Sequence, residues 1–163
     1  MATAADILFG RLVLQGSLLA RRQLDACMAQ LGDRPLPKVL VSLQMLDMPT
    51  AQRLARIVAQ RQFLRAELVF GQLLIRSNLV SRVALREAFE IQKKGGSRER
   101  LAKILYDCRL LSKQQIESII DAQLLELAEE SARTLAQGFE PTAPRPRKIP
   151  ATLVNQRPPS VEA

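Results

Sequence analysis

The sequence predicts an all-α fold of four tandem units, each a short helix followed by a longer one, with a long C-terminal helix and a disordered tail. Residues 70–92 (FGQLLIRSNLVSRVALREAFEIQ) and 101–123 (LAKILYDCRLLSKQQIESIIDAQ) place apolar residues in the same columns when one is shifted by 31 positions. Such a period is typical of stacked helical units that share a core. From position 139 onward prolines are frequent and apolar residues are few, which predicts disorder over 139–163.

The apolar spacing within one unit predicts its two helices. Phe70, Leu73 and Leu74 lie at i, i+3 and i+4, which is one face of a short helix. A small residue, Ser77, then favours a turn, and Ser81 is a good N-cap for the next helix because its hydroxyl can accept from free N–H groups. The stripe of that longer helix consists of Leu85, Ala88, Phe89 and Gln92.

Two further units are predicted upstream, near residues 8–32 and 36–62. The first unit matches closely, although Ala20 replaces the capping serine. In the second unit we expect a three-residue insertion around 47–49, with Thr50 as the N-cap of the following helix. That alignment puts Arg61 in the column where the later units have a terminal glutamine.

The third and fourth units are placed near 69–93 and 100–123, within a helical domain that spans residues 1–138. The basic glycine loop between these two units, KKGGSRER, has two readings: a helix C-terminus, or a loop that holds a phosphate. The last helix continues to about residue 137, which gives a length of roughly 37 Å. Its acidic end, with Glu126, Glu129 and Glu130, either folds back on the basic body or pairs with another molecule, a protein partner or a second copy of the chain.

Composition argues against several functional classes. The chain of 163 residues contains no histidine, which removes the commonest general base and zinc ligand and favours a protein that is not an enzyme and has no cofactor. No apolar run approaches the length of a membrane span, and no signal peptide is recognisable, so we expect a cytoplasmic protein. Cys27 and Cys108 lie far apart at apolar or small positions and are interpreted as two buried thiols, with a disulfide or a metal-binding pair as the alternative.

The repeating pattern L-G-x-L-L, small residue, L-[ILV]-[ST], then L-x-x-A-[LF]-x-x-Q, resembles the helical repeat in the N-terminal domains of type II secretion and type IV pilus assembly ATPases. The resemblance covers roughly residues 8–123, and no ATPase domain follows. It implies a bacterial regulatory or adaptor module standing alone. Some members of that family bind cyclic di-GMP through an arginine at the start of the motif and a glutamine at its end.

Only the fourth unit keeps that arginine, as Arg100, with Gln123 at its end. A nucleotide site implied by the resemblance would therefore use Arg100 and Gln123 together with Gln92 of the third unit. An arginine suits such a ligand because its guanidinium can grip a phosphate or a guanine edge. The alternative for Arg100 is a surface charge paired with Glu99, and the two glutamines can equally bridge neighbouring helices.

Three functions are consistent with these features. The repeats and the oversized acidic helix favour a non-catalytic protein-interaction module of a bacterial signalling, secretion or motility system. The resemblance and Arg100 favour a cyclic di-GMP receptor. The net charge of +8 favours nucleic-acid binding, but with one tyrosine and no tryptophan the chain has few residues on which bases can stack.

Overall fold

The computed structural model describes residues 1–96 and 99–139, and every regular element in these ranges is a helix. The predicted all-α class and long C-terminal helix are confirmed. Of the predicted tail 139–163, residues 140–163 lie outside the described residues, and Phe139 is buried rather than disordered. The helices are α1 (Ala4–Gln15), α2 (Arg21–Ala29), α3 (Leu36–Ser42), α4 (Met48–Arg76), α5 (Arg82–Lys94), α6 (Leu101–Asp107) and α7 (Lys113–Gln137).

Each of the four units turns in the same way between its short and its long helix. One residue in each turn has a positive φ of 52° to 57°: Ser17, Gln44, Asn78 and Arg109. The N–H of the next residue donates to a carbonyl five positions back, as Leu79 does to Leu74 and Leu110 does to Leu105. This is the Schellman end of a helix, in which the residue after the C-cap is left-handed. The small residues expected to allow the bend, such as Ser77, have ordinary helical φ and only precede it.

Arg109 carries a Cβ at a φ of 57°, where L-residues other than Asn and Asp are unfavourable. We expect Arg109→Gly to raise the free energy of unfolding by about 0.5–1 kcal/mol in urea denaturation. Arg109→Ala keeps the Cβ and is the control that should leave stability nearly unchanged. A loss of stability in the glycine variant would show that the arginine side chain contributes more than its backbone strain costs.

The second unit contains no insertion, so that expectation is wrong. Asp47, and not Thr50, is the N-cap of α4, and its carboxylate accepts from the Thr50 N–H at 2.9 Å. Asp47 follows Leu36 by the same eleven positions that separate Ser81 from Phe70. The glutamine column of this unit therefore holds a buried valine, Val58, rather than Arg61.

The Asp47 cap makes stability depend on pH in a defined direction. The hydrogen bond from the Thr50 backbone lowers the pKa of Asp47 below its ordinary value of 3.8. Because the folded pKa is the lower one, the stabilisation is complete above the ordinary value and disappears as pH falls through the folded pKa. We expect Asp47→Ala to be less stable than wild type in urea at pH 7, and the difference to shrink towards pH 3. Asp47→Asn keeps a capping oxygen at both pH values and is the control.

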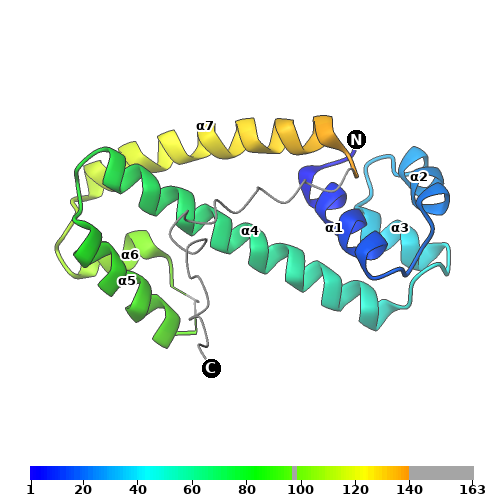
Figure 1. The fold of residues 1–163 in the computed structure, drawn as a ribbon, viewed down its shortest axis with the longest axis horizontal. Helices are drawn as coiled ribbons and strands as arrows, with labels where there is room; N and C mark the ends of the chain where they lie inside the picture. The colour runs from blue at the N-terminus through cyan, green and yellow to red at the C-terminus, as the bar shows by residue number, and fades with distance from the viewer. Residues whose placement is uncertain (97–98, 140–163) are drawn as a thin grey trace, which may run out of the picture.

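Helix α4 joins two lobes, as Figure 1 shows. It fuses the long helix of the second unit with the short helix of the third into one continuous helix. One buried cluster lies around α1–α3 and the start of α4, and includes Phe9, Leu24, Leu36 and Leu40. The other lies around the end of α4, α5 and α6, and includes Phe70, Leu74, Leu101 and Leu105. Each lobe is thus built from two units.

Helix α7 returns along α4 and ends beside α1 (Figure 1), so it contacts both lobes. Residue Phe139, directly after this helix, is buried in the N-terminal cluster. The acidic helix therefore folds back on the body, which is one of the two alternatives that the sequence left open. In the described part of the chain no helix is both long enough and apolar enough to span a bilayer.

The two cysteines differ in exposure. Cys27 is buried with its sulfur 3.2 Å from that of Met45, and burial raises the pKa of its thiol. Cys108 is exposed, so the interpretation of two buried thiols is wrong for this residue. It occupies the C-cap of the short helix α6, directly before the turn that leads to α7.

Candidate functional site

The residues of the implied nucleotide site gather around one turn of α4. Gln92 lies in the last turns of α5, Arg100 is the N-cap of α6, and Gln123 lies on α7. The structure brings Gln92 and Arg100 together on a side chain that the sequence interpretation did not include, Glu67. Gln123 instead donates to the backbone oxygen of Ala66, at 2.6 Å.

Glu67 is 4% exposed, and its carboxylate is surrounded by donors. Gln92 Nε2 donates to Oε2 at 2.7 Å, and the backbone N–H of Leu101 donates to the same oxygen. An Arg100 guanidinium nitrogen donates to Oε1 at 3.3 Å. A buried carboxylate is stable only when it is paired and hydrogen-bonded in this way. Glu67 therefore connects α4 to the end of α5 and to the first residue of α6.

Arg100 extends outward from this anchor. Its side chain is 62% exposed, and the guanidinium carbon lies 5.1 Å from the centre of the Phe63 ring, a cation–π distance. The expected pairing with Glu99 is replaced by pairing with Glu67, while Glu99 contacts Lys103 at 3.3 Å. Arg100 thus rests between the Glu67 carboxylate and an aromatic face, with part of its surface in solvent.

The N-terminal lobe contains a similar anchor. Asp6 is buried and lies three positions before Phe9, as Glu67 lies three positions before Phe70. Its Oδ1 accepts from the backbone N–H of Leu36, the first residue of α3, at 2.7 Å. The short helices of the second and fourth units, α3 and α6, are therefore each capped by a carboxylate. That carboxylate lies just before the Phe-Gly pair that opens the first or the third unit. The signal is present in the sequence as DILFG and ELVFG, an acid three residues before Phe-Gly.

These contacts determine what the site can do chemically. The Glu67 carboxylate already accepts from Gln92, Leu101 and one nitrogen of Arg100, so a bound phosphate would compete with that carboxylate for these donors. Within residues 1–96 and 99–139, every buried side-chain nitrogen or oxygen has a hydrogen-bond partner. No group of three or more metal-ligating side chains occurs in the same described ranges. The arrangement is that of a structural anchor.

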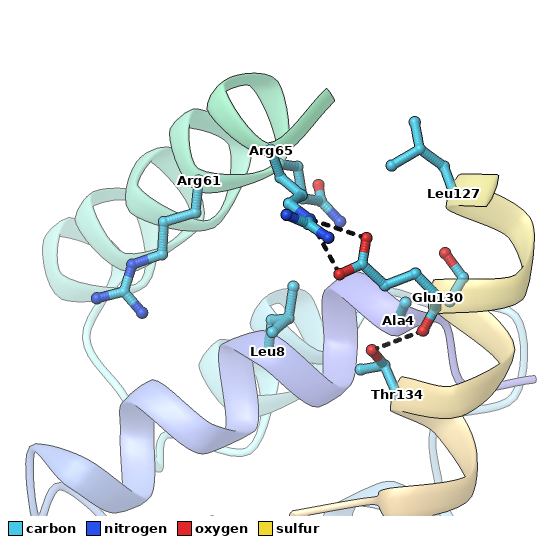
Figure 2. A pocket seen from close by; sticks show the side chains of 9 residues that line it. Ala4, Leu8, Arg61, Arg65, Leu127, Glu130 and Thr134 are labelled. Atoms are coloured by element: carbon cyan, nitrogen blue, oxygen red, sulfur yellow. Dashed lines mark hydrogen bonds and ion pairs between the residues drawn. The ribbon is translucent and has the colours of Figure 1, made fainter. Parts of the chain in front are cut away.

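A separate cavity of about 330 Å³ lies where α1, α4 and α7 meet (Figure 2). Ala4, Leu8 and Leu127 line it with apolar surface. Arg65 closes one side, since its Nε donates to both Glu130 oxygens at 3.0 Å, while Arg61 extends away from this pair (Figure 2). The cavity lies along the contact between packed helices, and the Arg65–Glu130 ion pair crosses it.

The acidic end of α7 is partly used by the fold. Glu130 pairs with Arg65, and Glu126 pairs with Arg76 at 3.4 Å, so two of its three carboxylates hold α7 on α4. The third, Glu129, pairs with Arg133 of its own helix at 3.9 Å and with no other residue of the described ranges. Exposed pairs of this kind contribute little to stability.

Large apolar side chains lie in solvent on both long helices. Leu64 and Leu68 on α4 are 46% and 45% exposed, and Leu124 and Leu125 on α7 are 61% and 65% exposed. A groove of about 350 Å³ also runs between α4 and α5. It is lined by Leu68, Gly71, Gln72, Ile75, Arg76, Leu85 and Phe89.

Comparison with family models, curated proteins and solved structures finds no match to this chain.

Proposed function

We propose that this chain is a non-catalytic protein-interaction module whose partner binds exposed leucines on the two long helices. The observation that carries the proposal is the exposure of Leu64, Leu68, Leu124 and Leu125, roughly half or more of each side chain. Single exposed apolar residues are ordinary, but neighbouring ones on α4 and again on α7 form patches of the kind that partners cover. The resemblance of the repeat to secretion and pilus ATPase domains favours a bacterial signalling, secretion or motility system as the setting.

The acidic end of α7 adds charge to one of these patches. Leu125 and Glu129 are four positions apart, so they lie on the same face of the helix. Glu129 is exposed, and among the described residues it forms an ion pair only within its own helix. A partner that contacts Leu125 would therefore also meet negative charge. Of the expected partner residues Glu126, Glu129 and Glu130, this supports Glu129, because the other two pair with arginines of α4.

Photo-cross-linking in the source cell tests the proposal. A photoreactive phenylalanine analogue placed at Leu68 or Leu124 should cross-link to one specific protein, and the purified partner should then bind the chain with a defined stoichiometry. The same analogue at Val83, an exposed apolar residue of α5 outside these patches, is the control. Cross-linking that is equal at all three positions, or absent from both patches, would contradict an interaction function.

The cyclic di-GMP hypothesis has one favourable observation, the exposed guanidinium of Arg100 beside Gln92. Because Glu67 already accepts from Gln92, the Leu101 N–H and one nitrogen of Arg100, we expect titration calorimetry of the full chain with cyclic di-GMP to show no saturable heat. Saturable binding near one ligand per chain, abolished by Arg100→Ala in a folded variant, would instead make the chain a nucleotide receptor.

A further inference from the structure

The second half of α7 lies on the body of the protein without a buried residue of its own. The buried residues of α7 are Ile119 and Gln123, and both belong to its first half. From residue 124 to residue 138 every residue is exposed or half-buried, and burial resumes only at Phe139. A helix gains stability in a protein mainly by burying an apolar face. The segment 124–138, which we call the strap, therefore depends on contacts at its edge and at its end.

The contacts along the edge of the strap are weak ones. Within the described ranges two ion pairs link it to α4, Arg65–Glu130 at 3.0 Å and Arg76–Glu126 at 3.4 Å. Both arginines are exposed, so water and salt screen the attraction. Under the strap lies the cavity of about 330 Å³ (Figure 2), where packed side chains would otherwise supply dispersion contacts. The edge contacts alone therefore hold the strap loosely.

The end of the strap is held by a set of close contacts. The Phe139 ring lies against Gly10 so closely that a Cβ there would collide with it. The Arg21 guanidinium carbon lies 5.2 Å from the centre of that ring, a cation–π distance. Arg11 donates to the Gly138 carbonyl from two nitrogens, at 3.0 and 2.8 Å. Helices α1 and α2 thus form a cleft that takes one aromatic side chain and the carbonyl before it.

The backbone of Gly138 directs the ring into this cleft. Gly138 has a φ of 56° and a ψ of −137°, close to the first central position of a type II′ turn, where glycine is preferred. A side chain at this φ is unfavourable because of its Cβ. A Cβ on Gly138 would nevertheless have no neighbouring atom within 4 Å. A substitution there would therefore act through the backbone alone, without a steric clash.

We propose that the strap is detachable, and that the Phe139 ring in its cleft is the contact that keeps it closed. When the ring leaves, the remaining contacts are ones that water can replace, so residues 124–138 open together. The first half of α7 stays packed through Ile119 and Gln123. Opening uncovers the cleft at Gly10 and the buried Ile7 beside it, so the strap controls access to this face of α1. The switch goes beyond the proposed interaction function and does not depend on it.

Hydrogen exchange of the full-length chain, followed by mass spectrometry, measures the opening. Residues 113–123 and 124–137 belong to one continuous helix, so they would exchange alike if α7 opened as a whole. A detachable strap should instead exchange about tenfold or more faster over 124–137 than over 113–123. The first half of α7 therefore serves as an internal reference in every variant.

Two substitutions should open the strap from different sides. Gly10→Ala places a Cβ where the Phe139 ring lies, while alanine favours the α1 helix itself, so exchange over 124–137 should accelerate about tenfold or more. Gly138→Ala should have the same effect through its backbone conformation. The matched control is Gly96→Ala, at another glycine with a positive φ and open space around its Cβ, directly after the C-cap of α5. It should leave exchange of the strap unchanged.

A double variant separates the ring contact from a general loss of stability. In the Phe139→Ala background, Gly10→Ala should add no further acceleration over 124–137, because no ring remains to be displaced. Independent, additive effects of the two substitutions would overturn the inference. So would equal acceleration over 113–123 and 124–137, which would show that the whole helix opens, or a Gly10→Ala variant whose strap is as protected as that of the wild type.

Discussion

Glu67→Ala should lower the free energy of unfolding by about 3 kcal/mol or more. The variant leaves the N–H of Leu101 without its acceptor and removes the carboxylate to which Gln92 and Arg100 donate. Because Gln92 and the start of α6 are buried, water does not replace these contacts freely. The cost is that of an unsatisfied buried network rather than of one exposed ion pair.

Urea denaturation measures this loss of stability, and two further variants serve as comparisons. Glu67→Gln retains an acceptor oxygen but loses the charge, so it should be destabilised less than Glu67→Ala. Leu64→Ala, at an exposed position of the same helix, should change stability by no more than about 0.5 kcal/mol. A loss of less than about 1 kcal/mol in Glu67→Ala would show that the anchor is not a main stabilising contact of the C-terminal lobe.

The position of the damage is as informative as its size. Glu67 caps α6, whereas Asp6 caps α3 by the same kind of contact in the other lobe. Hydrogen exchange should therefore accelerate at α6 in Glu67→Ala and at α3 in Asp6→Ala. Equal acceleration in both lobes, whichever acid is removed, would mean that the lobes unfold as one unit through α4.

Apolar spacing was sufficient to predict the helical repeat because each column is read from residues only three or four positions apart. Leu101, Ile104 and Leu105 are all buried, as the stripe requires. The position of the helix start in the second unit was predicted wrongly because of Pro49, which favours a loop when it is considered without its neighbours. Proline in the first turn of a helix lacks only an N–H that would be unpaired anyway, so α4 begins before it, at Met48.

The sequence predicted that Gln92 and Arg100 lie close together, but it did not predict Glu67, which lies far from both along the chain. Gln92 and Arg100 were expected to meet, and they do, but at a carboxylate 25 positions before Gln92. Spacing within one helix carries no information on which acid from another unit lies opposite a buried glutamine. The recurrence of an acid three residues before Phe-Gly, Asp6 and Glu67, was the available signal.

The periodicity of apolar residues also could not predict which of them are exposed to solvent. Ile7 and Leu68 occupy equivalent columns and are equally apolar, so periodicity assigns both to a core. Only the position of the last helix separates them, because its end covers the face of α1 and leaves the matching face of α4 in solvent. Where a repeat ends, one unit lacks the neighbour that its sequence can still accommodate.

Phe139→Ala should be the second large effect, with a loss of about 2–3 kcal/mol in the free energy of unfolding. The ring is 8% exposed and contributes to the N-terminal cluster, although the helix end that carries it can relax more than an interior site. Urea denaturation measures the loss. Leu135→Ala, on the same helix but 42% exposed, is the control that should cost much less.

The same variant tests the comparison between the lobes. Without the ring, Ile7 should become more accessible, as its equivalent Leu68 already is, so exchange at α1 should accelerate while α5 and α6 keep their protection. Phe139→Leu retains an apolar side chain and should recover most of the stability. If Phe139→Ala is as stable as wild type, the ring does not stabilise the packing of the N-terminal lobe.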